Sequence, residues 1–200
     1  MQPNIVRNYA FLLFCVLIAL LVQGLAPYWP LAFDRAAISD GQWWRLLSGG
    51  WLHHNAAHLW MNLAALCLLW TFLIPPLGGG LCWLLLSLLV ALVDAAIWLW
   101  VPQTIHYWGL SGALHGLFAI AACLQWLTQK RQAILWLAGL GGKLLWDLWH
   151  PDGMTADWIG TRVHVESHLL GSGLGVILGI VLTLYLSRHS VSTDVNATKG

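Results

Sequence analysis

Charged side chains are scarce in this sequence. Lys, Arg, Asp and Glu together make up 8% of its 200 residues, against about 25% in an ordinary soluble domain. The formal net charge of +1 provides no electrostatic reason to bind an acidic partner. The composition therefore excludes a nucleic-acid binder, a disordered chain and a soluble enzyme with a single membrane anchor.

Cysteines at metal-binding or redox spacing are also missing. Each of the four cysteines lies inside an apolar run, and no two of them are spaced as C-x-x-C. We therefore expect small, buried hydrophobic side chains rather than a disulfide framework. The four positions are Cys15, Cys67, Cys82 and Cys123.

Apolar residues, in contrast, are abundant. They make up 59% of the chain, or about 118 positions, and a membrane-spanning helix takes roughly 20 mostly apolar residues. The sequence therefore predicts an all-α, polytopic membrane domain of six helices over residues 1–187, followed by a polar cytoplasmic tail over 188–200. The six apolar segments are approximately 9–25, 56–74, 81–101, 109–128, 133–149 and 165–187.

Basic residues predict the orientation of these segments. They lie before the first segment, between the fourth and fifth, and after the sixth: Arg7, then Lys130 and Arg131, then Arg188 and Lys199. With an even number of spans, these three places fall on one side of the membrane, which the distribution of Lys and Arg makes cytoplasmic. Both termini are therefore predicted to be cytoplasmic.

Few ionisable residues fall inside the apolar segments, where such side chains are costly and are functional candidates by default. Counted to the residues that mark the cytoplasmic boundary, Ser111 lies 19 residues from Lys130, His168 lies 20 from Arg188, and His58 lies 17 from Pro75. At ~1.5 Å per helical residue, these counts correspond to depths of roughly 28, 30 and 26 Å. One hydroxyl and two imidazoles are therefore expected at nearly the same height. The ionisable residues are His58, Asp94, His115, Lys143, Asp147 and His168.

Glycines predict that the fourth and sixth segments pack closely. Gly171, Gly175 and Gly179 follow His168 at helical spacing, and small residues let two helix backbones approach each other. Gly112 and Gly116 are four residues apart and flank the face that carries Ser111. A Ser–His hydrogen bond requires such an approach.

The chemistry that fits these groups is nucleophilic attack by Ser111 with His168 as general base and then acid. No carboxylate is clearly placed to orient the imidazole, because Asp94 and Asp147 are on other segments, so we predict a dyad. His58 and Asn62 are one turn apart and are expected to stabilise a tetrahedral oxyanion.

Three short motifs follow one another on the second, fourth and sixth segments: His58-x-x-x-Asn62, GLSG at 109–112, and His168-x-x-Gly171-x-x-x-Gly175. With these motifs, and with Trp44-Arg45 in the first outer loop, the sequence resembles the rhomboid family of intramembrane serine proteases. The resemblance implies a six-helix bundle with Ser111 as nucleophile, His168 as base, and His58 and Asn62 as oxyanion stabilisers. It also implies substrates whose helices unwind near the outer membrane surface.

One position departs from the common rhomboid pattern. His115 stands four residues after the serine, where many rhomboids carry Tyr or Phe. The stretch GLSGALHG at 109–116 is similar to the rhombosortase branch. That resemblance implies a protease of the bacterial inner membrane that removes a C-terminal Gly-Gly-type transmembrane anchor from exported proteins, by hydrolysis or by transfer to another nucleophile. We expect Gly109, Gly112, His115 and His53 to support the site.

A metal or haem protein is one alternative function. His54 and His58, and likewise His164 and His168, are spaced as pairs of metal ligands. A non-catalytic relative that escorts helices is a second alternative. A metal or haem site would leave the serine–glycine motif unexplained, so we predict no cofactor and no metal. Lys143 and Asp147 are four residues apart and are expected to form a structural ion pair.

Overall fold

The computed structural model describes the backbone of residues 5–197 and the side chains of residues 5–72 and 77–188. Lys199, which contributed to the predicted orientation, lies outside the described residues. Within the described residues, long helices lie at all six predicted segments, and α9 continues past the predicted end of the last one. The long helices are α1 (Ile5–Leu25), α4 (Ala56–Leu77), α5 (Gly79–Trp100), α6 (Ser111–Gln125), α7 (Lys130–Trp149) and α9 (Val165–Ala197).

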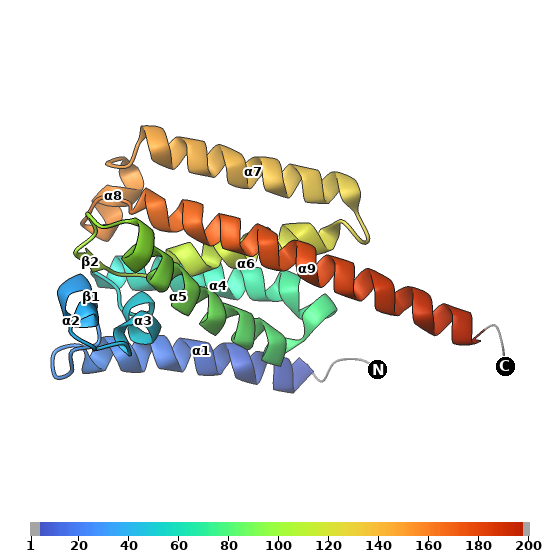
Figure 1. Cartoon of the computed structure of the whole chain (residues 1–200), viewed down its shortest axis with the longest axis horizontal. Helices are drawn as coiled ribbons and strands as arrows, with labels where there is room; N and C mark the ends of the chain where they lie inside the picture. The colour runs from blue at the N-terminus through green and yellow to red at the C-terminus, as the bar shows by residue number, and fades with distance from the viewer. Residues whose placement is uncertain (1–4, 198–200) are drawn as a thin grey trace.

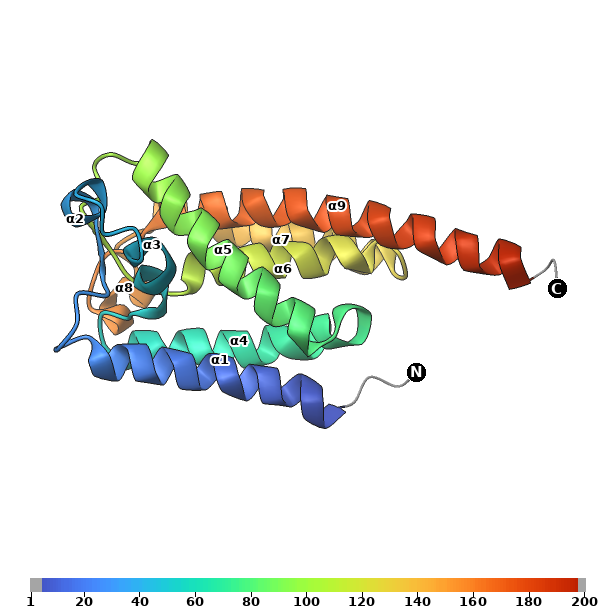
Figure 2. The same ribbon diagram turned by 60° about the horizontal axis from the view of Figure 1, so that its bottom comes forward.

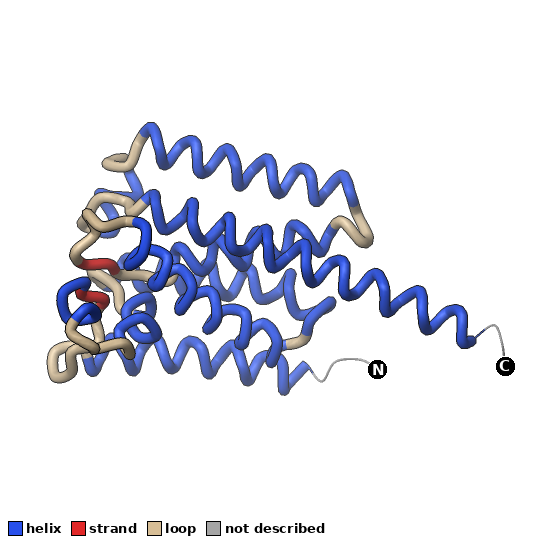
Figure 3. The backbone as a smooth tube through the Cα atoms, viewed as in Figure 1, coloured by secondary structure: helices blue, strands red, loops and turns tan. Residues whose placement is uncertain are grey.

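The short elements gather at one end of the helix bundle (Figures 1 and 3). Helix α1 begins and α9 ends at the opposite end (Figure 1). The short elements are β1 (Phe33–Asp34), α2 (Arg35–Ser39), α3 (Arg45–Ser48), η1 (Gly49–Trp51), β2 (His106–Tyr107) and α8 (Met154–Ile159). Strands β1 and β2 pair antiparallel, with Phe33 opposite Tyr107.

Among the residues that the structure describes, three helices are long and apolar enough to cross a membrane: α1, α5 and the Val165–Arg188 part of α9. Two shorter apolar helices cover Ala56–Phe72 and Ser111–Gln125. The chain is therefore an all-α membrane protein, and the count of six spans stays a prediction. Cys67 is exposed, which corrects the expectation that all four cysteines are buried; the other three are buried, and all four are free.

Arg35 holds the loop end of the bundle against the end of α5. Its guanidinium donates to four carbonyl oxygens, those of Ile97, Trp98, Val101 and Thr104, at 2.6–2.8 Å. The last carbonyl groups of a helix find no N–H donor within the helix and need donors from outside it. A cation is also favoured here, at the negative end of the helix dipole. Arg35 therefore fixes β1 and α2 to the top of α5.

Helix α6 lies at the centre of the bundle, between α4, α5, α7 and α9 (Figures 1 and 2). Most of its residues are buried, and Leu117 and Ile120 are fully enclosed. Its closest neighbour is α9, and the predicted glycine contact is confirmed. A Cβ placed on Gly175 would lie 2.6 Å from the Gly116 Cα, and one placed on Gly112 would lie 2.9 Å from the Ser167 carbonyl oxygen. The two backbones therefore approach as closely as glycine allows.

Candidate active site

Ser111 is the first residue of α6, directly after the turn that follows β2. Gly109 forms this turn at φ +106°, a left-handed conformation that favours glycine. The Tyr107 hydroxyl donates to the Gly109 carbonyl oxygen at 2.9 Å and fastens the turn. The N–H groups in the first turn of a helix have no acceptor within that helix, so Ser111 stands at the positive end of the α6 dipole.

His168, in the first turn of α9, lies next to Ser111. Its Nε2 is 3.0 Å from the Ser111 Oγ, within hydrogen-bond distance. His168 is 5% exposed, so bulk water competes little for this contact. The structure therefore brings together the Ser111 hydroxyl and the His168 imidazole. The sequence had predicted this contact from their similar depth and from the glycine spacing.

The other histidine at the start of α9 lies elsewhere. His164 Nε2 is 2.8 Å from the Thr104 Oγ1, and its Nδ1 accepts the Ser167 N–H at 3.1 Å. Burial lowers the pKa of His164, so the ring is neutral and acts as a cap for α9. His164 does not contact Ser111, so His168 is the histidine of this pair that lies beside the serine hydroxyl.

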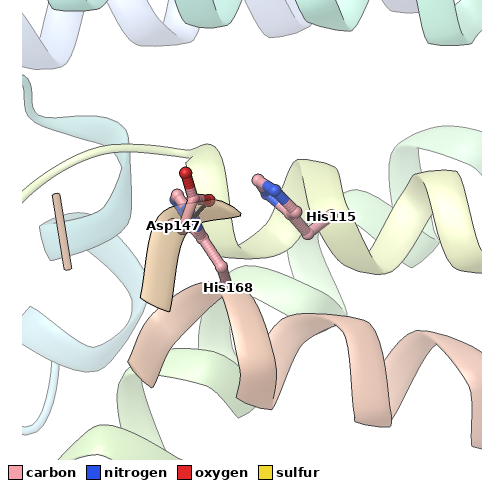
Figure 4. A group of neighbouring side chains, drawn as sticks. All are labelled: His115, Asp147 and His168. Atoms are coloured by element: carbon pink, nitrogen blue, oxygen red, sulfur yellow. Dashed lines mark hydrogen bonds and ion pairs between the residues drawn. The ribbon is translucent and has the colours of Figure 1, made fainter. Parts of the chain in front are cut away.

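Asp147 corrects the expectation that no carboxylate lies beside the imidazole. Its Oδ2 is 2.9 Å from the His168 Nδ1, while its Oδ1 accepts from the Lys143 ammonium, as the i,i+4 spacing predicted. Figure 4 shows Asp147, from α7, directly beside His168. Part of the signal for this contact, the depth of Asp147, was in the sequence. Asp147 is 17 residues from Lys130, or roughly 26 Å, the same depth as the other site residues.

His115 stacks on His168. The two ring centroids are 4.0 Å apart and the ring planes differ by 16°, and Figure 4 shows His115 reaching from α6. The His115 Nδ1 lies 2.7 Å from the Ser111 carbonyl oxygen, which accepts from it. This bond fixes the His115 ring, and the fixed ring limits the tilt of His168.

His58 and Asn62, on α4, face the start of α6. A Cβ on Gly109 would lie 2.6 Å from the His58 Nε2 and 3.6 Å from the Asn62 Nδ2, so only glycine fits between them and Ser111. Asn62 donates one amide hydrogen to the His58 carbonyl oxygen at 3.1 Å. The second hydrogen of its amide is available for another acceptor.

His53 supports His58 from the loop before α4. The two rings meet edge to face, with centroids 5.1 Å apart, and the His53 backbone is held by two hydrogen bonds with Gln23. Burial, and secondarily the neighbouring His58, lower the pKa of His53 to about 3. His53 is therefore neutral at ordinary pH and packs as an aromatic ring.

A cavity of about 320 Å³ lies at the loop end of the bundle. Its wall includes Lys143 and residues of β2 and α8, whereas Asp147 and His53 do not line it. The site residues that line it are His58, Asn62, Ser111, His115 and His168. The cavity is large enough to admit a segment of peptide, and it presents the Ser111–His168 pair to that segment.

The two predicted histidine pairs do not form a metal cluster in the described residues. The only group of three potential ligands found there is His115, Asp147 and His168, whose ligand atoms lie within 4.8 Å of one another. Both His168 nitrogens and both Asp147 oxygens already have protein partners. The Lys143 ammonium also opposes a second cation at this carboxylate.

The chain matches the model of a known protein family. Residues 40–185 match the family model described as the Rhomboid domain, which covers most of the chain. A search of curated proteins finds no match. The matched range includes all of the cavity residues named above.

Proposed function

Because this chain belongs to the rhomboid family of intramembrane proteases, we propose that it is a serine protease in which Ser111 is the nucleophile and His168 the general base. The observation that carries the proposal is the 3.0 Å separation of the Ser111 Oγ and the His168 Nε2 at the wall of a cavity. A serine hydroxyl needs an adjacent base to attack a peptide carbonyl.

In the acylation step, His168 Nε2 accepts the Ser111 proton as the Oγ attacks the scissile carbonyl carbon. The tetrahedral intermediate collapses when the protonated imidazole donates that proton to the leaving amine. The C-terminal part of the substrate then departs, and its N-terminal part remains as an ester on Ser111. Water, or another nucleophile, attacks this ester with His168 again as base.

Charge that develops on the carbonyl oxygen requires donors already in place. His58 and the second amide hydrogen of Asn62 are our candidates on one side of the cavity. This is supported by how closely both side chains approach the position that a Cβ on Gly109 would occupy. The N–H groups at the start of α6 are candidates on the other side, where the helix dipole favours an anion. Gly109 and Gly112 serve the site by letting α4 and α9 approach Ser111.

In the membrane, we place six spans with both termini on the cytoplasmic side and the cavity near the outer face. The gathering of the short elements and the cavity at one end, opposite the start of α1, supports this placement (Figure 1). The substrates are then proteins held by a transmembrane helix whose scissile bond enters the cavity from the bilayer.

The GLSGALHG stretch supports a narrower proposal. It favours a rhombosortase of the bacterial inner membrane, which removes a Gly-Gly-type C-terminal anchor from exported proteins. His115 distinguishes this stretch, and its stacking on His168 places the distinguishing residue at the reacting group.

Cleavage of a membrane-anchored reporter in proteoliposomes tests the general proposal. The wild type should release the soluble part, and Ser111→Ala should abolish release without changing the melting temperature. Ser39→Ala, which alters an exposed hydroxyl on α2, should cleave normally. Equal cleavage by Ser111→Ala and the wild type would contradict the mechanism, and a wild type that cleaves nothing would favour a non-catalytic relative.

The narrower proposal requires a second substrate. A reporter with a Gly-Gly anchor should be processed at least tenfold faster than the same reporter with an anchor lacking the two glycines. Equal rates would remove the basis for the rhombosortase assignment while leaving the protease assignment intact.

A further inference from the structure

A carboxylate lies where the dyad prediction placed none. Asp147 is 2% exposed, and both of its oxygens are engaged, one by His168 and one by Lys143. It lies in the last turn of α7, where the negative end of the helix dipole disfavours an acidic residue. A buried carboxylate at such a position must be paired and hydrogen-bonded, and His168 and Lys143 meet this requirement.

The contact determines which nitrogen of His168 carries the proton. An ionised carboxylate only accepts hydrogen bonds, so the His168 Nδ1 must donate to the Asp147 Oδ2. In the neutral ring, Nε2 is then unprotonated, and its lone pair faces the Ser111 Oγ at 3.0 Å. This is the tautomer that a general base requires.

Lys143 keeps the carboxylate in the form that this arrangement needs. Its ammonium donates to Oδ1, and its side chain is 44% exposed, so it is the more exposed member of the pair. A cation beside a buried carboxylate favours the ionised form. The ion pair expected from the i,i+4 spacing therefore accounts for only one of the two oxygens.

We propose that Asp147 is a positioning residue that holds His168 in the reactive tautomer and orientation, so that the site works as a Ser111–His168–Asp147 triad. Asp147 does not touch the substrate and gives up no proton. When His168 takes the Ser111 proton, both ring nitrogens are protonated, and the carboxylate stabilises the resulting imidazolium. This inference rests on the proposed function, because it assigns a partner to the proposed base.

Substitution of Asp147 by Asn tests the inference in the full-length protein. An amide at this position can donate to Nδ1, which places the proton on Nε2 and removes the base. We expect kcat for reporter cleavage to fall about 100-fold or more while KM changes less than threefold. Asp157→Asn, the same substitution at an exposed carboxylate on α8, should cleave at the wild-type rate. A kcat within threefold of wild type for a folded Asp147→Asn protein would overturn the inference.

A second measurement does not depend on the variant or on turnover. In ¹⁵N-histidine-labelled wild-type protein, the His168 signals, identified by their loss in His168→Gln, should show a protonated Nδ1 and an unprotonated Nε2. The opposite tautomer would overturn the positioning role even if Asp147→Asn fails to fold. If the wild type cleaves no reporter but shows the expected tautomer, the proposed function fails and the positioning by Asp147 stands.

Discussion

Three glycines of α9 (Gly171, Gly175 and Gly179) and the glycines of α7 have opposite surroundings. A Cβ on Gly175 of α9 would lie 2.6 Å from the Gly116 Cα, and one on Gly179 would lie 2.7 Å from the Cys123 Cβ. Three glycines on α7 have no atom within 4 Å of the same position: Gly139, Gly141 and Gly142. Helix α9 is therefore locked against α6 by backbone contact, whereas the middle of α7 has open space around it.

This difference in helix packing means that the side chains of the site are held with unequal firmness. Ser111 and His168 are on the two locked helices, so their separation is set by backbone packing. Asp147 is on α7, which buries only two other residues, Ala133 and Leu140. The contact between Asp147 and His168 therefore depends on the less firmly held helix, and the reacting pair can persist when α7 shifts.

Disrupting the contact between α6 and α9 should have the largest effect on stability and activity. Gly175→Leu forces a side chain into the α6 backbone. Overpacking typically destabilises by about 1–3 kcal/mol and occasionally by more, and contact with backbone favours the upper end of this range. We expect the melting temperature in detergent to fall sharply and activity to disappear. Gly173→Leu, on the same helix with nothing within 4 Å, is the matched control. Equal loss from both substitutions would show that the helix contact is not decisive.

Arg35 tests whether the loop end contributes to holding the start of α6. Arg35→Ala removes four hydrogen bonds to carbonyls around the end of α5, and hydrogen bonds from charged groups contribute about 1.5–3 kcal/mol each, not additively. We expect a loss of about 3 kcal/mol in unfolding experiments. A loss below about 0.5 kcal/mol would mean that the glycine contact alone suffices.

His115 tests the orientation of His168 from the α6 side. Aromatic stacking contributes about 0.5–1.5 kcal/mol, so His115→Ala should lower kcat up to about tenfold at unchanged stability. His115→Phe keeps a ring at this position and should remain within about threefold of wild type. If Phe and Ala are equally impaired, the hydrogen bond from His115 to the Ser111 carbonyl, rather than the stacking, matters.

The smallest effect is expected from a substitution on α7, and this substitution should stabilise the protein rather than destabilise it. Gly139→Ala adds a methyl group where nothing lies within 4 Å, and replacing glycine by alanine within a helix is favourable by roughly 0.5–1 kcal/mol. Unfolding should therefore shift to slightly harsher conditions. A destabilised Gly139→Ala protein would mean that the middle of α7 is as tightly packed as α9.

Much of this site could be predicted from the sequence, because depth along a spanning helix depends only on residue counts. Ser111, His168 and His58 were placed together in this way, and the glycine spacing identified the α6–α9 contact. Asp147 was assigned to Lys143 alone, because an i,i+4 pair satisfies a carboxylate locally and sequence does not reveal which way α7 faces.

The loop end was the least predictable part. Arg35 contacts carbonyls 62 to 69 residues away along the chain, and no periodicity signals such a contact. The same holds for Asp94, which had no partner in sequence and accepts the Gly50 N–H at 3.0 Å. Both side chains fasten the loop between α1 and α4 to α5, and neither lines the cavity.

Covalent labelling with a fluorophosphonate probe tests the central claim most directly, since the probe reacts only with an activated serine. Peptide mapping of the wild type in native membranes should locate the adduct on Ser111, and His168→Ala should reduce the labelling rate at least 100-fold. Labelling of Ser111 at the same rate in the wild type and His168→Ala, or no adduct on Ser111 in a protein that cleaves its substrate, would contradict the account.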